Sequence, residues 1–268
     1  MRSLAVVGVE TPVGAAAMVH FDGTAEVVGV RLEEVAAVGD LCQTCTDIIV
    51  CGDASLSSWD EQFGQLSRDA RLLARYVRMA AEAGVRLVYI SSDAVFDGPW
   101  VFHDDDSSAF SASRCSRQLQ SLEACVLKVP QNLVIRTNAL SDVPGAWLDQ
   151  LTQSFRQQTA QHLNARQFAT PLAASRLALL LDHILMTAAS GVVHVAGAER
   201  LSPWLFGQEL ARVSSASFQS VLPLNGQQPC ERSLRCTRAR REFRLRMPTL
   251  SQTITELTVD SSVVRRAA

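Results

Sequence analysis

The stretch Arg86-Leu-Val-Tyr-Ile-Ser-Ser-Asp-Ala-Val-Phe-Asp-Gly98 decides the fold that the sequence predicts. It begins as a short apolar run, which is typical of a strand buried on both faces of a parallel sheet. The run then breaks into three small polar residues, Ser91, Ser92 and Asp93. Doubly wound sheets bind their ligands at the carboxyl ends of such strands. The stretch therefore predicts an α/β fold with a ligand crevice at this point.

The N-terminal segment predicts the phosphate-binding unit of a dinucleotide fold. Ser3-Leu-Ala-Val-Val-Gly8 reads as a strand, and it runs through a glycine-containing turn into the helix-like Ala15-Ala-Ala-Met-Val. Thr11 followed by Pro12 is typical of a helix N-cap and a first-turn proline. A strand, a glycine turn and a helix start are the parts that cradle a diphosphate in such folds.

The segment Ser91-Ser-Asp-Ala-Val-Phe-Asp-Gly98 resembles the Ser-Thr-Asp-x-Val-Phe-Asp-Gly segment of dTDP-4-dehydrorhamnose reductases. Those enzymes are sugar-nucleotide members of the extended short-chain dehydrogenase/reductase family. Asn132-Leu-Val-Ile-Arg-Thr137 is similar to the family's Val-Ile-Val-Arg-Thr strand, and Arg166-Gln-Phe-Ala-Thr-Pro171 resembles its Gln-x-Gly-x-Pro-Thr segment. The resemblance covers nearly the whole chain and thins out after about residue 215.

The resemblance implies a doubly wound parallel Rossmann sheet with a small C-terminal substrate lobe. Strands are expected near 3–8, 25–30, 47–51, 86–91 and 132–136, all parallel in one sheet. We expect residues 1–140 and 164–196 to form the dinucleotide-binding-type domain. The smaller, substrate-binding-type lobe is then expected to consist of residues 141–163 and 197–268.

The cofactor residues that the resemblance implies depart from the family pattern. Gly8 and Gly14 hold the outer places of its GxxGxxG turn, whereas Thr11 replaces the middle glycine and adds a Cβ where the pyrophosphate should approach. Arg31, at the end of the second strand, suits the extra phosphate of NADP or is a solvated loop arginine. A carboxylate at Asp53 repels a diphosphate if it points inward. Binding of NADP or NAD is therefore expected to be weak or absent. The candidate cofactor residues are Gly8, Thr11, Pro12, Val13, Gly14, Arg31, Gly52 and Asp53.

The catalytic helix of the family should carry Tyr-x-x-x-Lys followed by a glutamate. Anchoring on Glu123 aligns Cys115 with the tyrosine and Leu119 with the lysine. The only tyrosines are Tyr76 and Tyr89, and the single lysine is Lys128, so the motif occurs nowhere in the chain. In the family the tyrosine passes a proton to or from the substrate oxygen and the lysine lowers the pKa of that tyrosine.

Two side chains remain as catalytic candidates, Ser92 and Cys115. Ser92 alone matches the family's catalytic trio in chemistry, and a thiol at position 115 is a candidate substitute acid. A run of arginines between 232 and 246 aligns with the substrate lobe, where guanidinium groups suit diphosphates. The alternative is the solvated face of a helix. The candidate substrate-binding residues are Ser91, Asp93, Val95, Phe96 and Arg235.

The composition restricts which binding partners and which cellular compartment we expect for this protein. A net charge of −2 argues against nucleic-acid binding, and no apolar stretch is long enough to span a membrane. The seven cysteines form no disulfide framework, and Cys42 and Cys45 form a lone CxxC without a second ligand pair for zinc. No signal peptide is recognised, so we expect reduced thiols, no metal site and a cytoplasmic location.

Two functions from different classes stay open, beside a plain structural subunit. The first is a non-catalytic or weakly active relative that binds a dinucleotide or nucleotide-sugar and contacts a partner protein. A regulatory subunit of methionine adenosyltransferase is one such use of the family fold. The second is an NADP-dependent nucleotide-sugar reductase or epimerase with a substitute acid. The missing tyrosine and lysine favour the first, and either function is compatible with a homodimer.

Overall fold

The computed structural model describes residues 2–214, 221–224, 226 and 228–264. The largest sheet among them has six strands in the order β10-β5-β4-β3-β1-β2, and every neighbouring pair is parallel. These strands are β1 Ser3–Val7, β2 Glu26–Val30, β3 Asp47–Val50, β4 Arg86–Ser92, β5 Leu133–Thr137 and β10 Gly191–His194. The five parallel strands expected from the sequence are confirmed.

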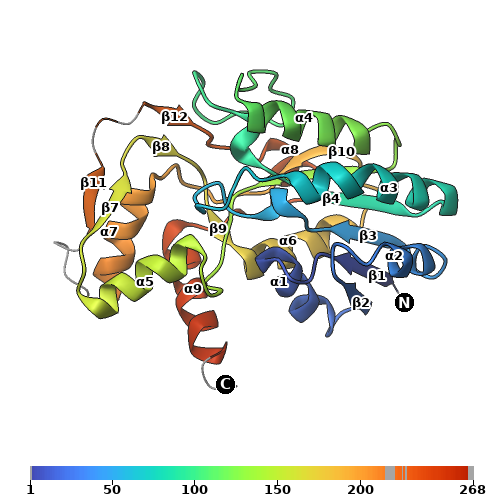
Figure 1. Ribbon diagram of the computed structural model, residues 1–268, viewed down its shortest axis with the longest axis horizontal. Helices are drawn as coiled ribbons and strands as arrows, with labels where there is room; N and C mark the ends of the chain where they lie inside the picture. Colours follow the sequence, from blue (N-terminus) through green and yellow to red (C-terminus); the bar gives the residue numbers. More distant parts are fainter. Residues whose placement is uncertain (1, 215–220, 225, 227, 265–268) are drawn as a thin grey trace.

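Helices cover both faces of this sheet (Figure 1). Helices α1 (Pro12–Phe21) and α6 (Ala174–Leu185) pack against each other on one face. On the other face α3 (Ser67–Ala83) packs between α2 (Val35–Leu41) and α4 (Arg114–Val126). The inner strands β1, β3, β4 and β5 are mostly apolar and almost wholly buried, because both of their faces are covered, whereas the edge strands β2 and β10 are partly exposed. The doubly wound α/β fold is therefore confirmed.

The smaller elements lie beside one end of the sheet, around β7 and α7 in Figure 1. They form two-stranded parallel pairs, β6 with β9, β7 with β11 and β8 with β12. The strands are β6 Ala139–Leu140, β7 Gln161–Asn164, β8 Gln167–Phe168, β9 Leu172–Ala173, β11 Val221–Leu224 and β12 Cys230–Glu231. The helices among them are α5 Trp147–Gln157, α7 Pro203–Val213 and α9 Leu250–Val264. Helix α8 (Thr237–Arg241) instead packs against β10, and the short 3-10 turns η1 (Asp53–Ser55) and η2 (Asp93–Val95) follow β3 and β4.

Two apolar clusters hold these layers together. The larger one fills both sides of the six-stranded sheet. The smaller one gathers Trp59, Trp147 and Phe206, whose rings meet edge to face with centroids 5.0–5.8 Å apart. Between β12 and α9 the chain returns to the sheet, because Leu234, Ala239 and other side chains up to Met247 pack into the larger cluster. The residue limits given above for the two domains stay a prediction.

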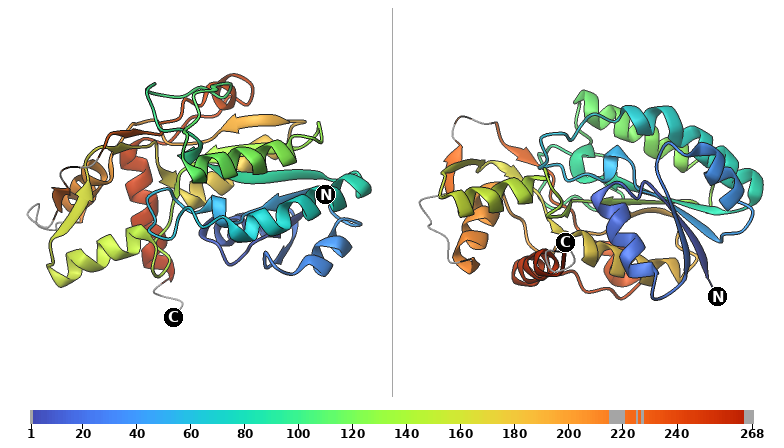
Figure 2. Two further views of the ribbon diagram at one scale, coloured as in Figure 1. Left: turned by 45° about the horizontal axis from the view of Figure 1, so that its top comes forward. Right: turned by 60° about the horizontal axis from the view of Figure 1, so that its bottom comes forward.

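Figure 2 shows α9 standing apart from the sheet, next to the smaller elements. Its contacts are with β9 and α6, which join the two parts of the molecule. No helix among the described residues is both long and apolar enough to cross a membrane.

Candidate active site

The glycine turn after β1 has the geometry that the sequence predicts. Gly8 has a φ of +92°, and a Cβ there would lie 2.0 Å from the carbonyl oxygen of Cys51. A Cβ on Gly14 would lie 2.1 Å from the carbonyl oxygen of Gly8. The Thr11 hydroxyl donates to Gly8 O (2.8 Å) and accepts from Gly14 N–H (3.1 Å), so it caps α1 just before Pro12. Only glycine fits at positions 8 and 14.

Two carboxylates, Glu10 and Asp53, lie beside the glycine turn that follows β1. Arg68, on α3, donates from its backbone N–H to Asp53 Oδ2 (3.0 Å) and from Nε to Asp53 Oδ1 (2.7 Å). Its Nη1 also donates to Glu10 Oε1 (3.1 Å), and Glu10 accepts from the backbone N–H of Leu32 at 3.2 Å. Asp53 and Glu10 are thus linked through one guanidinium. The backbone N–H of Arg31 is likewise occupied, by Glu34 (2.8 Å).

Gly52 keeps the turn after β3 close to Asp69. A Cβ on Gly52 would lie 1.9 Å from Asp69 Oδ1. The Asp69 carboxylate accepts from the backbone N–H groups of Asp53 (2.7 Å) and Ala54 (3.1 Å) and from the Tyr89 hydroxyl (2.7 Å). Burial raises the pKa of Asp69 although these bonds lower it. One of the two tyrosines is therefore committed to shaping this turn.

The polar residues at the end of β4 are all fully buried. The Ser91 hydroxyl donates to Glu123 Oε1 (2.6 Å) on α4. Glu123 in turn forms a buried ion pair with Arg136 of β5, with Nη2–Oε2 at 2.7 Å. The Ser92 hydroxyl accepts from Ala94 N–H (3.2 Å) and lies 3.3 Å from Asp93 Oδ1. Both serine hydroxyls are thus engaged within the protein.

Asp93 is the titratable group of this cluster. Its Oδ2 accepts from Asn138 Nδ2 (3.1 Å), and Asn138 also bonds to Ser57 and Ser58. Burial raises the pKa of Asp93 from 3.8 to about 6, although the charge of Arg232 and hydrogen bonds from neighbouring side chains lower it. An acid with such a pKa exchanges protons near neutral pH.

The two positions aligned with the missing catalytic pair lie on α4. Cys115, in the first turn, is partly exposed, and burial raises the pKa of its thiol while the charge of Arg232 lowers it. Leu119 is fully buried in the larger apolar cluster. The position that the resemblance aligns with the family's lysine is therefore occupied by an apolar, buried side chain.

Val95 and Phe96 are fully buried beside this cluster. The Val95 carbonyl accepts from the Ser116 hydroxyl (2.7 Å), and the Phe96 ring stacks on His103 with centroids 4.1 Å apart. The Arg136 guanidinium lies 5.1 Å from the Phe96 ring centre. Their part in substrate binding stays a prediction, since these contacts are internal.

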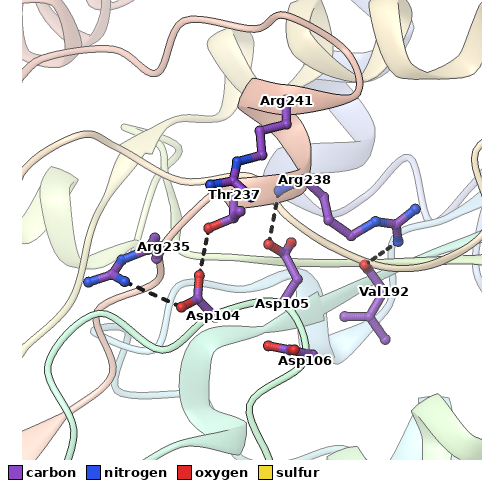
Figure 3. A pocket seen from close by; sticks show the side chains of 8 residues that line it. All are labelled: Asp104, Asp105, Asp106, Val192, Arg235, Thr237, Arg238 and Arg241. Carbon is purple, nitrogen blue, oxygen red and sulfur yellow. Dashed lines mark hydrogen bonds and ion pairs between the residues drawn. The ribbon is translucent and has the colours of Figure 1, made fainter.

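Arg235 lies elsewhere, in a pocket of about 630 Å³ along the edge strand β10 (Figure 3). Its guanidinium pairs with Asp104 at 3.3 Å. In the same pocket Asp105 accepts from the backbone N–H of Arg238, whose Nη1 donates to Val192 O (2.6 Å). Ser92, Asp93 and Cys115 do not line this pocket. The structure therefore does not bring Arg235 together with the residues at the end of β4.

Comparison with known proteins places these features in a family. The model of the family described as RmlD substrate binding domain matches residues 65–262. The chain belongs to this family. No curated protein sequence matches the chain significantly.

Solved structures similar to this RmlD-family chain include two dTDP-4-dehydrorhamnose reductases. The one from Bacillus anthracis, in complex with NADP, is 16% identical with a TM-score of 0.83, covering 97% of this chain and 99% of that one. The Clostridium acetobutylicum protein is 16% identical with a TM-score of 0.81 and the same coverage. Bordetella bronchiseptica WbmG, in complex with NAD and UDP, is 14% identical with a TM-score of 0.77, covering 96% and 92%. At these identities the likeness shows the fold.

Two residues of this RmlD-family chain were missed by the sequence reasoning. Glu10 is an acid inside the glycine turn, and its position between Gly8 and Thr11 was a visible signal. Arg232, after β12, acts on both Asp93 and Cys115, yet in the sequence it is one arginine of a long run. Within the described residues, no group of three or more histidine, cysteine or carboxylate side chains could hold a metal ion.

The pKa of Asp93 predicts a pH dependence for this RmlD-family chain. The folded pKa of about 6 lies above the ordinary 3.8, so the folded state binds the proton more tightly. Stability from this group is therefore complete at low pH and is lost as the pH rises toward 6. Between pH 4 and pH 7 we expect the free energy of unfolding to fall by about 2–3 kcal/mol relative to Asp93→Asn. Urea denaturation of both proteins at each pH measures this difference, and parallel pH profiles would contradict it.

Proposed function

We propose that this chain is a ligand-binding member of the RmlD family that does not perform the family's standard hydride transfer. Its ligand is a nucleotide-sugar or a dinucleotide, and it acts by contacting a partner protein in a ligand-dependent way. The observation that carries the proposal is Leu119, fully buried at the aligned lysine position in a chain without any Tyr-x-x-x-Lys motif. The seven unpaired cysteines support a cytoplasmic place of action, where thiols stay reduced.

The ligand class is supported by the fold and by its relatives. WbmG has the same fold and is described in complex with NAD and UDP, and the Bacillus anthracis reductase with NADP. In this chain the turn at Gly8 and the N-terminus of α1 fit a diphosphate. The carboxylates of Glu10 and Asp53 fit it poorly, because they add negative charge beside that turn. A sugar nucleotide bound chiefly by the smaller elements would keep its diphosphate away from these two carboxylates.

A thermal-shift comparison tests the proposal. NAD, NADP, and dTDP- and UDP-sugars are added separately to the purified protein. A ligand at 100 times its Kd should stabilise the fold by about 2.7 kcal/mol. We expect a sugar nucleotide to give this stabilisation and the dinucleotides to give less. No stabilisation by any of them would remove the proposed ligand class.

The carboxylates of the glycine turn give a quantitative expectation for the cofactor. We expect NADPH to bind with a Kd above about 1 μM, and Glu10→Gln to tighten it about fivefold or more because one nearby negative charge is removed. Calorimetry measures both constants. Glu33→Gln is the matched control, since Glu33 forms a mostly exposed ion pair with Arg71. Sub-micromolar binding of NADPH to the unchanged protein would contradict the expectation.

A second candidate function is favoured by one specific observation, the pKa of Asp93 near 6. In an NADP-dependent reductase or epimerase, Asp93 or Cys115 would act as the substitute proton donor. Cys115 is the more accessible of the two, whereas Asp93 is fully buried.

A further inference from the structure

Arg232 has a fixed backbone, and its side chain forms no direct ion pair with a carboxylate of the described residues. Its backbone N–H donates to the carbonyl oxygen of Phe168 (2.8 Å), directly after the pairing of β12 with β8. On either side of it, Glu231 pairs with Arg200 and the Ser233 hydroxyl donates to Glu231. Glu231 bonds to Ser233 and to Arg200, not to the Arg232 side chain. The backbone pairing of β12 with β8 therefore determines the position of Arg232.

The inner edge of the Arg232 guanidinium lacks an acceptor. Its Nε is buried and has no hydrogen-bond partner. Across the part of the chain that the structure describes, no carboxylate lies within 4.0 Å of it. Two other arginines of the run between residues 232 and 246 do have carboxylate partners: Arg235 pairs with Asp104, and Arg238 pairs with Glu242. A buried donor without an acceptor costs free energy, which an anionic ligand group would recover.

The ladder brings the segment of Arg232 next to the candidate active site. Gln167, opposite Cys230 in that ladder, donates from Nε2 to the carbonyl oxygen of Ser58 (3.2 Å). Asn138 bonds to both Ser58 and Asp93.

The charge of Arg232 acts at this place. It lowers the pKa of Asp93, at the end of β4, and that of Cys115, in the first turn of α4. It also lowers the pKa of Cys230, two residues before it. Arg232, directly after β12, therefore lies near the end of β4 and the start of α4, although it is distant from both in the sequence. Arg232 and Cys115 are both partly exposed, so a ligand can reach them.

We propose that Arg232 recognises a carboxylate on the sugar, so that the ligand is a nucleotide-sugar of the uronic-acid class. This rests on the function proposed above and specifies its ligand. A planar carboxylate matches the fork of a guanidinium and carries one negative charge. A phosphate group is the other source of an acceptor, but its greater charge suits a place beside the Asp93 carboxylate less well. Diphosphate recognition by Arg232 is therefore the competing outcome of the test.

The test is calorimetric titration of the full chain with UDP-glucuronic acid, UDP-glucose and UDP, and with dTDP-glucuronic acid and dTDP-glucose. The unchanged protein is expected to bind the acidic sugar at least about tenfold more tightly than the neutral sugar on the same nucleotide. Arg232→Gln should reduce this ratio to about one, and Arg232→Lys should keep part of it. Arg240→Gln is the matched control, because it removes an exposed arginine of the same tail, and its ratio should stay unchanged.

The possible results separate the two proposals. Equal affinity for acidic and neutral sugars overturns the assignment of Arg232 and leaves sugar-nucleotide binding intact. If Arg232→Gln weakens the binding of all these compounds equally, UDP included, then Arg232 contacts the diphosphate. That result also overturns the assignment of Arg232 to a sugar carboxylate. No binding of any of the five compounds to the unchanged protein also overturns the sugar-nucleotide ligand of the proposed function. A cooperative thermal transition of Arg232→Gln and Arg232→Lys confirms that the variants are folded.

Discussion

The purified protein is expected to transfer hydride from NADPH to a dTDP-4-keto sugar at least about 10²-fold more slowly than a reductase with an intact tyrosine and lysine. General acid catalysis is worth about 10²–10⁴ in rate, and this chain lacks both the acid and its positioning partner. Leu119 supplies no charge, and it is fully buried in the larger apolar cluster. A spectrophotometric assay of NADPH oxidation measures the rate.

The remaining member of the trio does not restore this step. Ser92 is buried, accepts a hydrogen bond from Ala94 N–H and lies within bonding distance of Asp93. Any residual rate should therefore be nearly unchanged in Ser92→Ala. Cys115→Ala and Asp93→Asn examine the substitute acids. Turnover at the family's rate that disappears in either of these two variants would establish the second candidate function.

Replacing Arg136 with methionine is expected to lower the free energy of unfolding by about 3–5 kcal/mol. Arg136 and Glu123 are both about 4% exposed in their side chains, so the change leaves a buried carboxylate without its counter-ion. It also removes the guanidinium from the rings of Phe96 and Phe110, whose centres lie 5.1 and 5.3 Å away. Denaturant unfolding monitored by fluorescence gives the value.

A surface ion pair gives the control for this experiment. Arg71 pairs with Glu33, and both side chains are more than 60% exposed. Arg71→Met should therefore cost about 1 kcal/mol or less. Adding Glu123→Gln to Arg136→Met should recover part of the loss, because the buried charge is then gone. A cost for Arg136→Met as small as that of Arg71→Met would mean that the buried pair does not hold α4 to β5.

The local features of this fold could be predicted from the sequence because they depend on neighbouring residues. The apolar run before Ser91 gave the central strand, and Thr11 with Pro12 gave the start of α1. The resemblance to the reductases predicted that Cys115 and Leu119 lie on one helix, and both lie on α4. Each of these inferences needed only a few residues of the chain at a time.

The contacts that define the candidate site could not be predicted, because they join distant segments. Arg68 lies 58 residues from Glu10, and pairing between them depends on how α3 approaches the glycine turn. Arg235 and Arg232 belong to one arginine run, yet Arg235 pairs with Asp104 in the pocket beside β10, whereas the charge of Arg232 acts on Asp93. Charge and spacing alone could not predict which arginine of that run lies near Asp93.

Deuteride transfer tests the central claim most directly. The protein is saturated with the 4-keto form of the sugar nucleotide that stabilises it, because the keto carbon can accept hydride, and NADPH deuterated at the transferred position is added. Mass spectrometry of the sugar then reports whether deuterium has been incorporated. The account predicts a bound ligand with no incorporation on the timescale of a reductase's turnover. Deuterium appearing in the sugar at the rate of an intact family enzyme would contradict it.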